Sequence, residues 1–233
     1  MKAMILAAGR GERLRPLTDR IPKALLVAGG KPLLAWHLER LAQAGFRDIV
    51  INVSHLAEAI EARLGNGSAF GVALAYSREA QPLESAGGIA QARALLGHEP
   101  FALVNADIFC DYDLAALRAR ALDGGLAHLV LAPNPPHHTA GDFTLEAGKA
   151  GNAPAPRYTY TGIALIDPAL VAPVRPGDKA QLAPLLRAAA QDGRLSGEVY
   201  RGLWRDIGTP ERLAELDALL RGRMKAGACR RTT

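Results

Sequence analysis

The chain has 233 residues, two of them cysteines, and 49% of its residues are hydrophobic. This length suits one large α/β domain or two small ones with a substantial core. It excludes a membrane-spanning protein, because no apolar run approaches the length of a membrane helix. Cys110 and Cys229 are too few for a disulfide framework, so we expect a cytoplasmic protein.

The formal net charge of +5 is concentrated at the C-terminal end. Residues 221–233 carry five cations and no acid, so the preceding 220 residues balance to zero. A neutral body is not an electrostatic footprint for nucleic acid. We therefore expect no nucleic-acid partner and no membrane partner, and we predict a basic flexible tail over 221–233. Nothing in the sequence implies an oligomer, and a monomer is favoured.

Strands and helices are predicted to alternate through residue 132. Apolar runs predict strands at 3–6, 25–27, 49–51, 72–76, 101–105 and 128–132. Apolar residues at helical spacing predict helices near 34–41, 57–64 and 89–96, and Gly45 and Gly65 are stop signals for the first two. This alternation favours an α/β fold with a Rossmann-like, mostly parallel sheet flanked by helices.

The pattern changes after residue 132, where prolines and glycines become frequent. Strands are predicted at 144–145, 158–165 and 203–204, and a helix at 182–190. A last helix begins after Thr209 as N-cap, with Pro210 in its first turn. We expect one domain over 1–220, with a nucleotide-binding core over 1–132 and a small closing part over 133–220.

The first strand ends in a loop suited to phosphate. Gly9 and Gly11 permit a sharp turn that exposes backbone N–H groups. Arg10, Arg13 and Arg15 follow, with Lys23 further on, and together they form a plausible cradle for a triphosphate. The spacing fits neither a Walker loop nor the dinucleotide fingerprint.

Two aspartates follow predicted strands, where ligands bind in open α/β sheets. Asp107 comes after the strand at 101–105, and Asp206 after that at 203–204. Two carboxylates converging on a triphosphate would suit Mg²⁺, which takes one or two carboxylates, waters and substrate phosphates. The alternative is that both are ordinary turn or capping residues. His137-His138 is read as a loop pair rather than a metal site.

The string from Leu6 to Leu25 resembles the signature of the sugar-1-phosphate nucleotidyltransferases. It reads Leu-Ala-Ala-Gly-x-Gly-x-Arg-Leu-x-Pro-Leu-Thr, then Pro-Lys-x-Leu. Trp204-x-Asp206-Ile-Gly-Thr also matches. Other strings are similar to the N-acetylmuramic acid 1-phosphate uridylyltransferases within that family: Pro82-Leu83-Glu84, Gly141-Asp142-Phe143, Leu182-Ala183-Pro184-Leu185-Leu186 and Ser196-Gly197-Glu198.

This resemblance implies a nucleotidyltransferase fold of the GT-A-like kind, with an acceptor-binding part in the second half. It implies an enzyme that transfers UMP from UTP to N-acetylmuramic acid 1-phosphate and releases pyrophosphate, in peptidoglycan recycling. Mannose-1-phosphate guanylyltransferase and glucose-1-phosphate thymidylyltransferase remain alternatives with the same chemistry. A non-catalytic sugar-nucleotide sensor is an alternative of another class, which the joint retention of the residues with implied catalytic roles disfavours.

The resemblance implies four catalytic residues. Arg13 would bind the β- and γ-phosphates, and Lys23 the α-phosphate and the acceptor phosphate. Asp107 and Asp206 would hold Mg²⁺. No general base is needed, because the acceptor phosphate is already an anionic nucleophile.

The remaining implied roles concern binding. The nucleotide would contact Ala8, Gly9, Gly11, Glu12, Leu83 and Asn105, and the sugar would contact Asn105, Gly141 and Asp142. One departure is serious, because the Glu-Lys-Pro segment whose lysine grips the acceptor phosphate in larger relatives has no counterpart between 143 and 160. Either Lys23 suffices, or another cation such as Arg157 or Lys179 takes its place.

Overall fold

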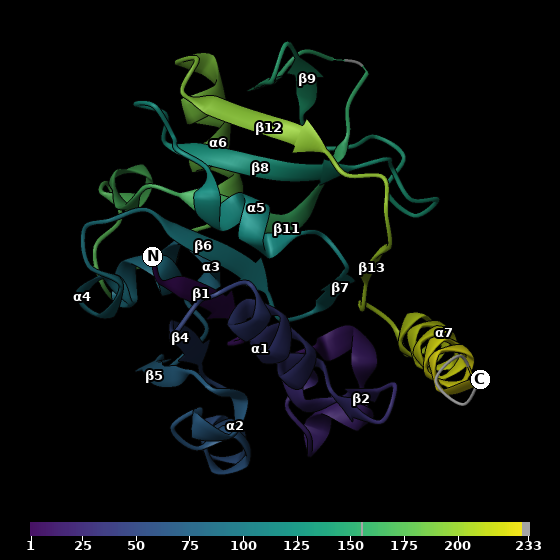
Figure 1. Ribbon diagram of the computed structural model, residues 1–233. Coiled ribbons are helices and arrows are strands. Elements are labelled where there is room, and N and C mark those ends of the chain that lie inside the picture. Colours follow the sequence, from purple (N-terminus) through teal and green to yellow (C-terminus); the bar gives the residue numbers. More distant parts are fainter. Residues whose placement is uncertain (155, 230–233) are drawn as a thin grey trace.

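A nine-stranded sheet forms the centre of the fold (Figure 1). The computed structural model describes residues 1–154 and 156–229, with side chains described to residue 224. Across the sheet the strand order is β5 (Ala73–Arg78), β4 (Asp48–Val53), β1 (Ala3–Leu6), β6 (Phe101–Asn105), β11 (Thr159–Ile166), β8 (Ala127–Ala132), β12 (Leu195–Val199), β10 (Lys149–Gly151) and β9 (Thr144–Glu146).

The sheet is parallel over its first four strands. β5, β4, β1 and β6 pair in parallel, as do β8 and β12. β11 is antiparallel to both of its neighbours, β6 and β8. The second half of the chain therefore contributes strands to the same sheet. The carboxyl ends of β1, β4, β6 and β8 lie at the same edge of it.

Helices cover both faces, and β1 shows why. Ala3 and Ile5 pack with α1 (Leu33–Gln43), α2 (Ala57–Leu64) and α5 (Leu114–Ala119). Met4, which points to the other face, packs with α3 (Glu84–Gln91), α4 (Arg93–Leu96) and α6 (Leu182–Gln191). Successive strand side chains alternate between faces, so an apolar strand serves two cores at once.

A third apolar cluster packs the C-terminal helix against segments from the first 33 residues. Leu216 and Leu220 of α7 (Pro210–Cys229) pack with Leu14 and Leu26 beside the hairpin of β2 (Val27–Ala28) and β3 (Lys31–Pro32). Figure 1 shows α7 outside the main sheet, near β2. A separate ribbon pairs β7 (Ile108–Cys110) with β13 (Trp204–Asp206) and brings the two predicted metal-binding segments together.

Several details differ from the sequence-based expectations. The strand predicted at 25–27 is a 3₁₀ turn at Lys23–Leu25 followed by the two-residue strand β2. β10 and β12 were not predicted, because Gly and polar residues interrupt their apolar pattern. Residues 221–229, expected to begin a flexible tail, continue helix α7, and residues 230–233 lie outside the described residues. Among the described residues, no helix is long and apolar enough to cross a bilayer.

Candidate active site

The loop after β1 presents unused backbone donors. None of the N–H groups of Ala8, Gly9, Arg10 and Gly11 donates to another described residue. Gly11 has φ +66°, and a Cβ there would lie 2.9 Å from Thr18 Cγ2, so glycine is required. At Gly9 a Cβ would meet nothing within 4 Å. The loop thus offers a row of free amides to an anion.

This loop forms one wall of a cavity of about 920 Å³. Asn105 and Asp107 enter it from the end of β6, and Lys23 from a 3₁₀ turn. Eight of the residues predicted to be catalytic or to bind the nucleotide line this cavity: Ala8, Gly9, Gly11, Glu12, Arg13, Lys23, Asn105 and Asp107. The shared carboxyl edge of the strands brings these distant segments together.

Lys23 and Asp107 form an ion pair within the cavity. Lys23 Nζ lies 2.6 Å from Asp107 Oδ2, and the Lys23 side chain is 11% exposed whereas that of Asp107 is 42% exposed. The lysine stem is held by packing while the carboxylate keeps an open side. Asp107 can therefore accept a cation from the cavity without leaving its strand end.

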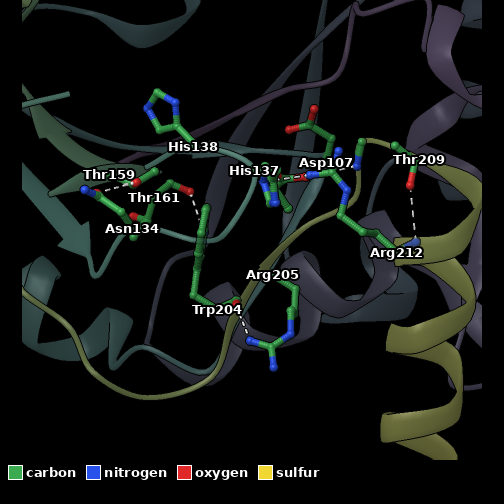
Figure 2. Close-up of polar contacts among 12 residues, drawn as sticks. Asp107, Asn134, His137, His138, Thr159, Thr161, Trp204, Arg205, Thr209 and Arg212 are labelled. Atoms are coloured by element: carbon green, nitrogen blue, oxygen red, sulfur yellow. Dashed lines mark hydrogen bonds and ion pairs between the residues drawn. The ribbon is translucent and has the colours of Figure 1, made fainter. Parts of the chain in front are cut away.

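Asp206 lies on the strand that pairs with the residues after Asp107, but its carboxylate contacts other partners. β13 pairs Asp206 with Ile108, and the Ile207 N–H donates to the Asp107 carbonyl at 2.8 Å. The Asp206 carboxylate forms an ion pair with Arg212 and lies 2.6 Å from His137 Nε2. Figure 2 shows Arg212 reaching from the start of α7 toward His137.

Asp206 lines a second cavity, of about 540 Å³, and Gly208 two residues later lines the first. A Cβ at Gly208 would lie 2.7 Å from Arg212 Nη2 and 3.1 Å from Arg13 Nη2. The absence of a side chain there lets two guanidinium groups approach the same point. Asp206 and Gly208, two residues apart, therefore line different cavities.

A buried hydrogen-bond network connects the loops around the first cavity. Asn52, at the end of β4, accepts from the Ala7 N–H at 2.7 Å and donates to Glu79 Oε1 at 2.7 Å. Glu79 Oε2 accepts from the Leu83 N–H at 2.8 Å. Burial raises the pKa of the Glu79 carboxyl. The network ties the β1 loop to residues 79–83.

Leu83 is buried and does not line the first cavity. Its N–H is used by Glu79, and its carbonyl accepts from Ala180 at 3.0 Å. The adjacent Pro82 and Glu84 line the cavity instead. A nucleotide contact at Leu83, as predicted from the sequence, would therefore find no free N–H there.

Gly141 and Asp142 line neither cavity. The Asp142 carboxylate accepts from the Tyr160 N–H at 2.8 Å and lies 3.1 Å from His138 Nε2. Gly141 has φ +63° and packs against Arg157. This internal pairing fixes the loop at 133–142, and the sugar-binding role predicted for both residues has no geometric support.

The structure distinguishes the two replacement cations that the sequence left open. Lys179 lines the first cavity, 3.9 Å from Glu84 Oε1. Arg157 instead donates to the Ala153 carbonyl at 2.7 Å and to the Asn152 carbonyl at 3.0 Å. Only Lys179 of these two is placed to meet a ligand.

Sequence reasoning missed four residues of this region: Asn52, Glu79, His137 and Arg212. Asn52 left a signal, because a buried amide in the apolar run Ile49–Val53 needs a partner. The two histidines were read as a loop pair. The structure turns them to different carboxylates, His137 to Asp206 and His138 to Asp142. Arg212 gave no signal, because an arginine in a first helical turn is commonplace.

The donor set suits a hard divalent cation that shares its ligands with a bound nucleotide. Among the described residues, no group of three or more His, Cys, Asp or Glu side chains could hold a metal ion. Mg²⁺ does not need one, since it takes one or two carboxylates and completes its shell with water and phosphates. Asp107, with its open side toward the cavity, fits that role. Asp206 fits the same role once one of its carboxylate oxygens is no longer bound by His137 or Arg212.

Comparison with known proteins identifies the family. Residues 2–143 match the family model described as nucleotidyl transferase. The chain is 50% identical to an N-acetylmuramate alpha-1-phosphate uridylyltransferase of Neisseria meningitidis serogroup B, over 94% of this chain and 98% of that protein. A protein of the same description from Caulobacter vibrioides is 35% identical, over 94% and 96%. Mannose-1-phosphate guanyltransferase beta-A of Xenopus laevis is 30% identical, and the chain covers 62% of its length.

Solved structures show the same fold. One, described as a glucose-1-phosphate thymidylyltransferase from Bacillus anthracis, superposes with a TM-score of 0.85 at 24% identity, over 95% of both chains. A UDP-glucose pyrophosphorylase superposes with a TM-score of 0.78 at 21% identity, over 95% of this chain and 98% of the other. From the family match and the extent of the sequence identity, the chain belongs to the nucleotidyl transferase family.

Proposed function

We propose that this enzyme transfers UMP from UTP to N-acetylmuramic acid 1-phosphate, releasing pyrophosphate. The observation that carries the chemistry is the convergence of Lys23, Asp107 and the free loop amides on one cavity. The choice of substrates is supported by the two uridylyltransferases that match nearly the whole chain, at 50% and 35% identity. The guanyltransferase relatives match at lower identity and are longer.

The proposed reaction is an in-line displacement at phosphorus. An oxygen of the acceptor phosphate attacks the α-phosphorus of UTP, a new P–O bond forms, and the bond to the β-phosphate bridging oxygen breaks. Its electron pair leaves with pyrophosphate. Both reactants are anions, so the protein must hold them together and stabilise the charge that develops on the leaving group.

The positive groups of the first cavity suit that task. Arg13 and the amides of Gly9 to Glu12 would bind the β- and γ-phosphates, where charge accumulates. Lys23, fixed by Asp107, would lie between the α-phosphate and the acceptor phosphate. Asn105 at the end of β6 would orient ribose or sugar hydroxyls, and Ala8 would contact the nucleoside. Lys179 is the cation we propose for the acceptor side.

Asp107 and Asp206 would hold Mg²⁺, which supplies charge neutralisation for the phosphates when bound. Consumption of UTP and of a muramic sugar phosphate would place the enzyme in the cytoplasm and in peptidoglycan recycling. A 1–132 core with a 133–220 acceptor part and a monomeric state remain part of the same proposal.

The test is pyrophosphate release with Mg²⁺ from UTP, GTP and dTTP, each with N-acetylmuramic acid, N-acetylglucosamine and mannose 1-phosphates. We expect turnover with UTP and the muramic sugar to exceed that with every other pair. Greater turnover with another pair would overturn the substrates and leave the chemistry. Nucleotide binding without turnover in any pair would overturn the enzymatic proposal.

A further inference from the structure

The second cavity adjoins the first along the chain, because Asp206 lines one and Gly208 lines the other. It opens at the carboxyl end of β8, where Ala132 and the prolines that follow form one wall, and Trp204 forms another. Asp206 lines it, whereas Asp107 lines the first cavity. An acceptor phosphate positioned between the two aspartates would direct its sugar into this second space, whose apolar walls suit the face of a sugar ring.

Positive charge dominates the polar lining of this cavity. Three arginines line it together with two acids, Asp206 and Glu215. Arg212 and His137 already share Asp206. This leaves Arg201 and Arg205, which are exposed and have no carboxylate partner within the part of the chain that the structure describes.

The two arginines are held near the cavity by the strand itself. Arg205 is in the middle of β13, between Trp204 and Asp206, and its Nη1 donates to the Trp204 carbonyl at 2.7 Å. Arg201 precedes the same strand. One guanidinium edge of Arg205 is thus used for orientation, and its remaining donors are available to an anion.

We infer that Arg201 and Arg205 bind a carboxylate carried by the acceptor sugar. The inference rests on the proposed function and deepens it. An N-acetylmuramic sugar differs from N-acetylglucosamine by a lactyl ether that ends in a carboxylate. A guanidinium group binds a carboxylate through paired N–H···O bonds. These arginines therefore favour the muramic sugar over sugar 1-phosphates whose sugar carries no carboxylate.

The experiment compares binding of the two sugar nucleotides that differ only in that ether. Affinities of UDP-N-acetylmuramic acid and UDP-N-acetylglucosamine are measured by calorimetry for the wild type, Arg201→Gln, Arg205→Gln and the double variant. We expect the double variant to lose roughly tenfold in affinity for the muramic nucleotide and less than about twofold for the other. Arg205→Lys keeps the charge without the paired geometry. Its affinity for the muramic nucleotide should lie between those of the wild type and Arg205→Gln.

Arg63→Gln is the matched control, because Arg63 is exposed on α2, away from the residues that line either cavity. Equal losses for both nucleotides, or an unchanged ratio in the double variant, would overturn the arginine assignment while the proposed function stands. Failure of the wild type to bind or form the muramic nucleotide, with another sugar nucleotide formed instead, would overturn the proposed function and this inference with it.

Discussion

Lys23 and Asp107 compensate each other's charge in the free protein, and Arg212 does the same for Asp206. Each carboxylate is therefore held in place before any ligand arrives. Such preorganisation reduces the reorganisation needed when a cation and a triphosphate enter. It also means that each substitution at the site removes one charge and leaves its partner uncompensated.

Asp107→Asn tests the role of the carboxylate directly. It removes the negative charge proposed for Mg²⁺ while preserving shape, so we expect turnover to fall by at least about 10³-fold. Affinity for UTP without Mg²⁺ should change only severalfold, because Lys23 and the loop amides remain. Steady-state kinetics and calorimetry measure the two effects. Asp192→Asn, at an exposed helix end, is the control, and wild-type turnover in Asp107→Asn would contradict the assignment.

Gly11→Ala and Gly9→Ala separate strain from exposure within one loop. Gly11 has φ +66°, and its added Cβ would collide with Thr18 and Lys23. We expect the free energy of unfolding to fall by about 1–3 kcal/mol in Gly11→Ala. Gly9 has open space around it, so Gly9→Ala should stay within about 0.5 kcal/mol of the wild type. Equal stabilities in denaturant titrations would show that the loop adopts another conformation.

At the scale of elements, the Asn52–Glu79 network joins the ends of β1, β4 and β5 to the segment that leads into α3. Both oxygens of Glu79 accept from different elements. Glu79 is 5% exposed, so water cannot replace a lost partner. The network therefore acts as a positioning device for the walls of the first cavity.

Glu79→Gln leaves one of its two donors without an acceptor. This costs about 1–3 kcal/mol of stability, and the displaced wall should raise KM for UTP by more than KM for the acceptor. Denaturant unfolding and steady-state kinetics provide the two readouts. Glu58→Gln is the matched control, since Glu58 is 79% exposed and forms only a surface ion pair with Arg78. Equal rises in both KM values would contradict a role at the nucleotide wall.

The α1 helix carries a buried histidine beneath the end of β6. Burial lowers the pKa of His37 from 6.5 to about 4, and nearby Arg40 contributes. Because the folded state resists protonation, the unfolded state binds more protons between these values, and stability falls as pH drops through that range. From pH 7 to pH 5 the loss from His37 is about 2 kcal/mol.

His37→Gln should remove that part of the pH dependence. The free energy of unfolding, measured at pH 7 and pH 5 for both proteins, should fall by about 2 kcal/mol more in the wild type. Other titrating groups contribute equally to both proteins and cancel in the difference. Identical pH slopes would show that His37 can be protonated in the folded protein.

At the scale of the whole molecule, local signals predicted the α/β alternation and the glycine loop but not the layout of the second half. β11 returns between β6 and β8, a placement set by partners far away in sequence. β12 reads as polar because Ser196 and Glu198 alternate with glycine and valine, yet it pairs with β8 through its backbone. Local periodicity does not encode such partners.

The site likewise contains residues that could be predicted from the sequence and residues that could not. Residues that follow β1 and β6 could be predicted, because parallel strands end at one edge of the sheet. The partners of Asp206 come from residues 137 and 212, which the sequence does not connect. The carboxylate of Asp142, predicted to bind the sugar, accepts from the Tyr160 N–H of β11 and lies beside His138 of its own loop, and neither contact could be predicted from the sequence.

The most direct test of the central proposal is a competition assay. The enzyme receives UTP, Mg²⁺ and equal concentrations of N-acetylmuramic acid, N-acetylglucosamine and mannose 1-phosphates, and mass spectrometry follows the nucleotide sugars formed at low conversion. Under competition the product ratio equals the ratio of kcat/KM values. The account predicts that UDP-N-acetylmuramic acid predominates, with one pyrophosphate released per product. A predominance of either other nucleotide sugar would contradict it.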